Sequence, residues 1–414
     1  MNTGQERINE FVIREKRGRL GMRSEWTKKK LSDIVDFNPR ETIKKGTIAK
    51  KIPMDVLRPF YRDIPYYVEA CFSSGMKFRN GDTIMARITP CLENGKTAQV
   101  SILNDGEVGF GSTEYIVFRA KEGIADKDYL YYLVCSPEVR ELAIKSMVGS
   151  SGRQRVQTDV VKNLEIDVPP LVEQEKIGSL LKLFDDKIAL NDRINNNLLE
   201  QALTLYATHF SSVDKNGCIG DYCAVKSGFA FKSSWWTNNG VKVIKIGSIN
   251  QDNLNLLECS YVDEDKADKA KDFVVKAGDL LIAMTGATIG KFSMVPYSSE
   301  VLLVNQRVGK FFLGNHPVKK LPFIYCTLKQ PEVYNEVVNR GQGSAQPNIS
   351  ASDIMSIPCV IPSQDVINDF NDAAQPLFDL IISNQRENQQ LSELRNTLLP
   401  KLMSGELDVS NIDL

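Results

Sequence analysis

Two stretches of the chain place their apolar residues at alternating steps of four and three positions. This spacing puts the side chains on one stripe of an α-helix, and it is the heptad pattern of helices that pack on each other. The first stripe consists of Ile177, Leu181, Phe184, Ile188, Asn191, Asn195, Leu198, Ala202 and Leu205. The second stripe consists of Phe370, Ala374, Leu377, Ile381, Asn384, Asn388, Leu391, Arg395 and Leu398. The pattern predicts long helices over residues 171–210 and 363–404.

The two stripes are copies of each other. Phe370 stands 193 residues after Ile177, and every later position of the second stripe keeps the same offset. A repeat of this length is too long for a solenoid, whose units span roughly 20–50 residues. It fits a duplicated unit that consists of one globular domain followed by one long helix.

Two asparagines interrupt each stripe, Asn191 and Asn195 in the first and Asn384 and Asn388 in the second. A buried side-chain amide favours another amide opposite it and thereby sets the register of a helix pair. We therefore expect the two helices to run antiparallel, with the asparagines of one facing those of the other. The alternative is that each helix packs separately on its own domain, in which case no shared heptad phase is needed.

Similar segments also precede the two helices. Thr158-Asp159 and Ser352-Asp353 have the residue types of helix N-caps. The alternating apolar residues that follow predict a closing strand in each copy, which Pro169 or Pro362 would end. Further upstream, each copy has a turn that leads into a buried strand, at Gly81-Asp82 and Gly278-Asp279.

These patterns predict a mixed α/β (α+β) chain with a pseudo-two-fold internal repeat, in which two long antiparallel coiled-coil helices separate two globular domains. The expected boundaries are 1–22 for an N-terminal extension, 23–170 for the first domain, 171–210 for a central helix, 214–362 for the second domain and 363–404 for a C-terminal helix. Residues 1–22 are either a helical arm or a segment upstream of a start at Met22. Between the shared blocks the two domains differ greatly, which is typical of related surfaces that bind different targets.

The composition is that of an ordinary globular protein, with 42% hydrophobic and 25% charged residues. At 414 residues, the chain is long enough for two cores. The formal net charge is -1, so binding to nucleic acid has to come from local patches. One basic stretch extends from Trp26 to Arg62. It contains ten lysines and arginines but four acidic residues.

No motif in the sequence indicates a metal or catalytic site. The eight cysteines form no C-x-x-C pair, and His209 and His316 are the only histidines available for a zinc site or a Ser–His–Asp triad. The loop from Gly286 to Lys291 is one residue too short for a P-loop, and Phe292 replaces the Ser or Thr that holds magnesium. Unpaired cysteines fit a reducing cytoplasm, and no apolar run of about 18 residues could span a membrane. We expect no catalytic residues and no metal in this chain.

Motifs that recur in the same order in both copies resemble the specificity subunits of type I restriction-modification systems. They are a Gly-Asp turn, a Gly-Ala-Thr-Ile-Gly-Lys-like loop, a Gly/Ser/Gln-rich turn, a P-P-L-x-E-Q-x-x-I junction and the long helix. The Gly-rich turns are Gly149-Ser-Ser-Gly-Arg-Gln154 and Gly341-Gln-Gly-Ser-Ala-Gln346, and the first junction begins at Pro169. The second copy departs at its junction, Pro362-Ser-Gln-Asp365, and the first copy has only Glu93-Asn-Gly-Lys96 in place of the loop.

The resemblance implies that each globular domain is a target-recognition domain for one half of a bipartite, asymmetric DNA site. The spacer helices would then set the length of the unread gap. The resemblance also implies a non-catalytic protein of the prokaryotic cytoplasm whose partners are double-stranded DNA, two methylation subunits and the restriction/translocase subunits. S-adenosylmethionine, ATP and magnesium would be used by those partners, so no cofactor is expected in this chain.

Lysine and arginine position a protein on DNA phosphates, while arginine, lysine and side-chain amides read base edges. Glycine-rich loops can approach a backbone closely because they lack side-chain bulk. The candidate DNA-binding residues of the first domain are Lys44, Lys45, Arg87, Lys96, Arg153 and Arg155. Those of the second domain are Lys226, Lys232, Lys245, Lys291, Arg307, Gln342 and Gln346. Trp235 and Trp236 either stack on bases or belong to the core.

Two other functions stay open at this level. A coiled-coil scaffold could bind protein rather than DNA, although the basic stretch and the Gly-rich loops weigh against it; a salt-dependent affinity for duplex DNA separates the two. The chain could also be a nuclease or a methyltransferase in its own right, and a carboxylate-based nuclease site would need only scattered Asp, Glu and Lys. Turnover of DNA by the isolated chain would reveal such an activity.

Overall fold

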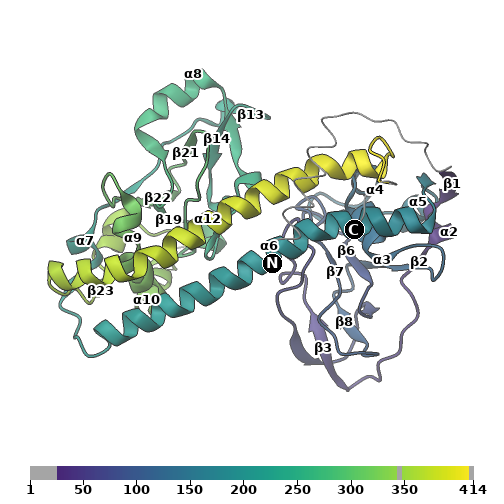
Figure 1. Cartoon of the computed structure of the whole chain (residues 1–414), viewed down its shortest axis with the longest axis horizontal. Helices are drawn as coiled ribbons and strands as arrows, with labels where there is room; N and C mark the ends of the chain where they lie inside the picture. Colours follow the sequence, from purple (N-terminus) through teal and green to yellow (C-terminus); the bar gives the residue numbers. More distant parts are fainter. Residues whose placement is uncertain (1–25, 343–346, 410–414) are drawn as a thin grey trace. The chain divides into compact units, whose positions relative to one another are not determined.

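The computed structural model describes residues 26–342 and 347–409. Its contacts divide the chain into two compact units (Figure 1). Unit 1 combines Met1–Ala189 with Leu391–Leu414, and unit 2 is Leu190–Gln390. The expected N-terminal extension, residues 1–22, lies outside the described residues.

Unit 1 contains two four-stranded sheets, in the orders β2-β9-β6-β7 and β4-β3-β8-β5, and a short ribbon of β1 and β10. Strands β3 and β8 are parallel. The strands are β1 Thr27–Lys30, β2 Val35–Phe37, β3 Ile48–Ile52, β4 Val68–Cys71, β5 Lys77–Phe78, β6 Thr83–Ala86, β7 Thr97–Gln99, β8 Gly109–Gly111, β9 Tyr115–Ala120 and β10 Glu165–Val168. The short helices are α2 Leu31–Ile34, α3 Lys127–Cys135, α4 Pro137–Lys145 and α5 Thr158–Lys162.

The central strand β6 joins the two layers of the unit 1 core. All four of its residues are buried, as in a strand with apolar neighbours on both faces. Successive side chains of a strand point to opposite faces. Ile84 therefore packs in the cluster that contains Ile52 and Phe78, whereas Met85 packs in the cluster that contains Tyr129 of α3.

Unit 2 has an equivalent set of strands and helices. The strands are β11 Gly217–Cys218, β12 Val225–Ser227, β13 Trp236–Thr237, β14 Val241–Ile244, β15 Ile249–Asn250, β16 Asn253–Leu254, β17 Ser260–Val262, β18 Val274–Val275, β19 Leu280–Ala283, β20 Phe292–Met294, β21 Leu302–Val304, β22 Val308–Phe311 and β23 Pro358–Cys359. The short α-helices are α7 Ile219–Tyr222, α8 Glu264–Ala267, α9 Leu321–Lys329, α10 Pro331–Gly341 and α11 Ala351–Met355. The 3-10 helices are η1 Ser233–Trp235, η2 Ile246–Ser248, η3 Leu256–Glu258, η4 Asp268–Phe273, η5 Gly286–Thr288 and η6 Pro317–Lys319.

The sheets of the two units have the same topology. The sheet β12-β22-β19-β20 matches β2-β9-β6-β7, and β17-β14-β21-β18 matches β4-β3-β8-β5. In both of the latter sheets the central pair is parallel and the outer pairs are antiparallel. Unit 2 adds β13 and the hairpin of β15 and β16. The mixed α/β fold with an internal repeat is therefore confirmed.

The segments that close each domain form as expected, but their caps differ from the prediction. Strands β10 and β23 pair with β1 and β11, the first strands of their domains. Helix α5 begins at Thr158 itself, with no side-chain cap. Helix α11 begins after Ser350, not Ser352, because the Ser350 hydroxyl accepts a hydrogen bond from the Asp353 backbone N–H. Strand β23 ends at Cys359, before Pro362.

The two long helices are α6 Leu171–Phe210 and α12 Gln364–Met403. In each unit their apolar stripes pack on each other and on the sheet. The unit 1 cluster includes Ile177, Leu181, Phe184 and Ile188 of α6 with Leu391, Leu398 and Leu402 of α12. The unit 2 cluster includes Ala202, Tyr206 and Phe210 of α6 with Phe370, Ala374 and Ile381 of α12. The alternative in which each helix packs separately on its own domain is wrong.

Within unit 2, the asparagines of the two helices meet in a polar layer. Asn191 Nδ2 donates to Asn388 Oδ1 (2.8 Å), and Asn384 Nδ2 donates to Asn195 Oδ1 (2.8 Å). Asn388 Nδ2 donates in turn to Asp192 Oδ1 (2.9 Å). The residue numbers of the partners decrease along α12 as they increase along α6, so the helices are antiparallel, as predicted.

Replacing Asn191 with leucine will lower the free energy of unfolding by about 1–3 kcal/mol. The reason is that the buried amide of Asn388 loses its donor, and a buried polar group without a partner carries its full desolvation penalty. Replacing both Asn191 and Asn388 with leucine will recover most of that loss, since an apolar pair of similar size costs little. Urea unfolding of the three proteins measures the difference. A single variant as stable as the parent chain would contradict this role of the polar layer.

Candidate nucleic-acid interface

The Gly-rich turn of unit 1 packs against the segment that follows β6. Val156 N donates to Arg87 O (2.9 Å), and Thr89 N donates to Gln154 O (3.0 Å). On the other side, Arg87 N donates to Glu114 O (2.9 Å). These bonds fix the backbone of three segments that are distant in sequence. We call the three segments the first frame, which consists of residues 87–89, Glu114 and residues 154–156.

Two glycines allow the turn that leads into the first frame. Gly149 has a φ of 134°, and a Cβ at this position would lie 2.9 Å from the carbonyl oxygen of Arg153. Gly152 has a φ of 77°, a left-handed conformation that glycine adopts without strain. The exposed side chain of Arg153 is thereby presented from a tight turn.

The side chains of the first frame form a charged cluster around Glu114. Its carboxylate accepts hydrogen bonds from Arg155 Nη2 (2.7 Å) and from Arg87 Nε (3.1 Å). The Arg155 guanidinium, followed by that of Arg87, holds the pKa of the Glu114 carboxyl below its usual value, although partial burial opposes the shift. The side chains of Arg87 and Arg155 remain 34% and 45% exposed, so both can reach a ligand outside the protein.

Unit 2 repeats the same backbone hydrogen bonds. Ile349 N donates to Met284 O (2.9 Å), and Gly286 N donates to Pro347 O (3.0 Å). Met284 N donates to Arg307 O (3.0 Å). We call these segments the second frame, which consists of residues 284–286, Arg307 and residues 347–349.

The two frames share a backbone but carry different side chains. At one position an arginine is replaced by an apolar residue, at another the charge is reversed, and at the third an arginine is replaced by an amide. The matched positions are Arg87 with Met284, Glu114 with Arg307, and Arg155 with Asn348. Each unit therefore presents a different chemical surface on the same support.

Sequence reasoning selected Arg87, Arg155 and Arg307 but missed Glu114. Nothing in the local pattern separates Glu114 from other acidic residues. A signal did exist, because Glu114 directly precedes the buried strand β9 just as Arg307 directly precedes β22. The equivalence is visible only once the two strands are aligned.

Lys96 and Lys291 also occupy equivalent places beside the frames. Their backbone carbonyls accept hydrogen bonds from the last residues of β6 and β19, at 3.0 and 2.8 Å. Each follows a glycine with positive φ, Gly95 at 72° and Gly290 at 83°. The Lys96 ammonium donates to Met54 O (2.9 Å), so this side chain points back to its own domain.

The structure places Lys44 and Lys45 apart from the first frame. Both are exposed in the turn before β3. The last residue of β3, Ile52, pairs with Gly111, which lies three residues before Glu114. The two lysines are therefore at the far end of β3 from the frame.

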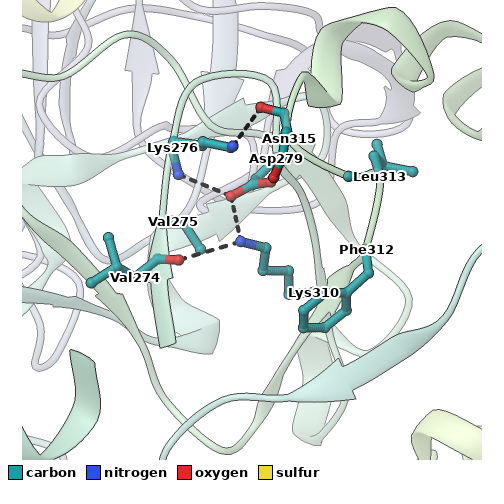
Figure 2. Close-up of a pocket in the computed structure, with 9 residues that line it drawn as sticks. Val274, Val275, Lys276, Asp279, Lys310, Phe312, Leu313 and Asn315 are labelled. Atoms are coloured by element: carbon teal, nitrogen blue, oxygen red, sulfur yellow. Dashed lines mark hydrogen bonds and ion pairs between the residues drawn. The ribbon is translucent and has the colours of Figure 1, made fainter. Parts of the chain in front are cut away.

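A cavity of about 330 Å³ in unit 2 is lined in part by Asp279, Lys310 and Phe312 (Figure 2), and Lys226 lies beside Phe312. Its ammonium is 5.1 Å from the ring centroid of Phe312, which lines the cavity. Lys310 forms an ion pair with Asp279 there (2.6 Å) and approaches the carbonyl oxygen of Val274. Asp279 precedes β19 whereas the second frame follows it, so the cavity lies at the opposite end of this strand. Lys226 pairs with Lys310, which pairs with Leu281 near the start of β19.

Lys232 and Lys245 flank two tryptophans. The Lys245 ammonium lies 4.3 Å from the ring centroid of Trp236, and that of Lys232 lies 5.7 Å from the ring centroid of Trp235. Both indoles are half-buried and pack against a small apolar cluster of unit 2, so they belong partly to the core. Ile246, which follows Lys245, lies near Gly286 of the second frame, since a Cβ added to this glycine would be 3.8 Å from Ile246 Cδ1.

The remaining predicted residues lie around the second Gly-rich turn. Gln342 is exposed at the C-terminus of α10, and Gln346 lies outside the described residues. Asn348 N donates to Gly341 O (2.9 Å), which ties the end of α10 to the second frame.

The basic stretch from Trp26 to Arg62 does not form one exposed patch, in contrast to the expectation from sequence. Lys50 is almost buried and forms an ion pair with Glu107 (2.9 Å). Arg62 is buried and forms an ion pair with Asp186 of α6 (2.7 Å). These two charges are neutralised within unit 1 by Glu107 and Asp186.

Among residues 26–342 and 347–409, no group of three or more His, Cys, Asp or Glu side chains is arranged to hold a metal ion. In the same part of the chain, no helix combines the length and the hydropathy needed to cross a membrane.

Two segments, residues 23–200 and 214–393, match the family model of the type I restriction modification DNA specificity domain. The chain is 23% identical to the type I restriction enzyme MjaVIII specificity subunit of Methanocaldococcus jannaschii, over 74% of this chain and 76% of that protein. It is 26% identical to the MjaIX specificity subunit of the same organism, over 70% and 71%. A solved type I restriction-modification S subunit from M. genitalium is 16% identical, over 93% of this chain and 98% of that one, with a TM-score of 0.49.

Proposed function

Because the chain belongs to the family of type I restriction-modification DNA specificity proteins, we propose that unit 1 and unit 2 each read one half of a bipartite, asymmetric DNA site. The chain is the DNA specificity subunit of such a system and the non-catalytic part of its enzyme. The family match covers both units, which supports one reading domain in each.

The subunit acts in a complex with partner subunits that relies on it for DNA recognition. We propose that these partners are two methylation subunits and the restriction/translocase subunits, in a prokaryotic cytoplasm. Bound S-adenosylmethionine, ATP and magnesium belong to the partner subunits, so this chain is expected to carry no cofactor of its own. The chain would direct adenine methylation or restriction to the sites that it selects.

The repeated frame is the observation that carries the proposal. Two backbones with matching hydrogen bonds present side chains of different charge and hydrogen-bonding capacity. Sequence is read by contacts to base edges, and an asymmetric site needs two readers that differ. A scaffold that binds only protein has no need of paired turns that end in exposed arginine and asparagine side chains.

The candidate residues divide by place into two proposed roles. Arg87, Arg155, Arg307 and Asn348 would face base edges from the frames. Lys44, Lys45 and Lys226 lie away from the frames, so we assign them to phosphates, which carry no sequence information. The other candidates border the frames and would contact either the walls of a DNA groove or the phosphates. They are Lys232, Lys245, Lys291, Arg153 and Gln342.

Exchanging residues 214–362 for those of a relative with a different target will change one half of the methylated site and leave the other half unchanged. The reason is that this segment contains the second frame but no part of the first. The measurement is a map of methylated adenines on a DNA library, made with the chain in complex with its methylation subunits.

The reciprocal exchange of residues 26–168 is the control, and it should change the other half only. If neither exchange alters the methylated sequence, and the affinity for DNA does not depend on salt, the chain is a scaffold and the proposed function is wrong. Any methylation or cleavage by the isolated chain would overturn its non-catalytic role.

A further inference from the structure

The guanidinium groups of the first frame are held by hydrogen bonds to Glu114, but not all of their N–H donors are used. Arg87 donates to Glu114 through Nε, and Arg155 donates through Nε and Nη2. Within the described residues, neither terminal nitrogen of Arg87 has a hydrogen-bond partner, and the same holds for Nη1 of Arg155. Each side chain therefore keeps donors that Glu114 does not use, while hydrogen bonds to Glu114 hold its position.

Such an anchored guanidinium fits one base better than the others. Guanine presents two acceptors, O6 and N7, on its major-groove edge, and an arginine fork binds both at once. Adenine has a donor beside N7, so it cannot accept the same pair of bonds. A long side chain loses conformational freedom when it binds, and this loss weakens binding. Because Glu114 already holds the two arginines in place, most of this loss is avoided.

The second frame offers a different set of donors at the same places. The position of Arg87 is taken by the thioether of Met284, which donates no hydrogen bond. Asn348, in place of Arg155, carries an amide that can pair with N6 and N7 of adenine. Arg307 replaces the carboxylate of Glu114 and is exposed, so the second frame has no acid to hold its arginine.

We infer that the three matched positions of the frames determine base preference, with Arg87 and Arg155 reading guanine in the first half-site and Asn348 reading adenine in the second. Glu114 is a positioning residue for the two arginines. This inference rests on the proposed function and names the bases that each frame selects.

The test transfers the side chains of the second frame to the first. The triple variant Arg87→Met, Glu114→Arg and Arg155→Asn, in complex with the methylation subunits, is compared with the parent complex on a randomised DNA library. We expect the preference for guanine at one position of the first half-site to fall by on the order of tenfold to a hundredfold, with adenine gaining there. The second half-site should stay unchanged, which also shows that the variant is folded.

Two further variants separate positioning from charge. Glu114→Gln keeps the shape but weakens the anchoring, so we expect a partial loss of guanine preference, and Glu114→Asp should retain more of it. The matched control is the double variant Lys44→Ala and Lys45→Ala, which should weaken binding to all sequences alike and lower the salt dependence, without changing any preferred base.

The failures of the two proposals are distinguishable. If the parent complex selects no two-part sequence, the proposed function is wrong. If it selects one, but the first half-site has no guanine preference, or the triple variant keeps that preference, only the assignment of bases is wrong. An equal loss of affinity for every sequence in the triple variant would also overturn the assignment, since it would place these side chains on phosphates.

Discussion

Replacing Arg395 with methionine will lower the free energy of unfolding of unit 1 by about 3–5 kcal/mol. The guanidinium of Arg395 forms an ion pair with Asp185, and the two residues are only 6% and 5% exposed. Removing one member of a buried pair leaves the other charge without compensation in a medium of low polarity. This is one of the few single changes that can unfold a marginally stable domain.

The surroundings of this ion pair explain why its loss is costly. Tyr132 donates its hydroxyl proton to Asp185 (2.6 Å), and the carbonyl oxygen of Phe60 accepts a bond from Arg395 (3.3 Å). Burial is the largest single influence and would lower the pKa of the Arg395 guanidinium, but the charge and hydrogen bond of Asp185 together with Tyr131 and Tyr132 raise it above its usual value. The Arg395 guanidinium therefore stays charged inside the core.

Urea unfolding and hydrogen exchange of unit 1 amides will measure the effect. The double variant Asp185→Leu and Arg395→Met should recover most of the stability, because apolar residues of similar volume often replace a buried ion pair without loss. Arg386→Met is the matched control on the same helix, at an exposed position, and should change stability by less than about 0.5 kcal/mol. A small loss in the Arg395→Met variant would mean that the ion pair does not stabilise unit 1.

Replacing Phe370 with alanine will lower the free energy of unfolding of unit 2 by about 3–5 kcal/mol. The ring of Phe370 is fully buried and lies at the centre of an aromatic cluster. Its centroid is 5.3 Å from that of Phe210, 5.6 Å from that of Tyr206 and 6.5 Å from that of Phe323. The change removes apolar burial and leaves a cavity that these rigid rings cannot fill.

This second effect connects α12 to both α6 and α9, so hydrogen exchange should show faster exchange in all three segments of unit 2. Leu380→Ala is the control, because Leu380 is on the same helix but 46% exposed. Its stability should match that of the parent chain within about 0.5 kcal/mol. If the two variants lose equal stability, the aromatic cluster does not hold the helix pair together.

The candidate site was only partly accessible from the sequence. Arg87, Arg155 and Arg307 were selected because lysine and arginine are the residues that contact DNA phosphates and base edges, and the structure brings each of them into a frame. Lys44 and Lys45 had the same appearance in the sequence but lie at the far end of β3. Charge and local composition do not reveal at which end of a strand a loop lies in the fold. The sequence therefore could not separate the residues of the frame from lysines far from it.

Local periodicity was enough to predict the two long helices, their antiparallel pairing and the duplication of the fold, because heptad spacing and repeated motifs are properties of neighbouring residues. Which distant residues meet was decided by the tertiary structure alone. Asp185 finds Arg395 across 210 positions, and Glu114 finds Arg155 across 41. Here the partner that stabilises the buried charge or holds the guanidinium belongs to a segment distant in sequence. The residues next to such a partner do not reveal that it will form the contact.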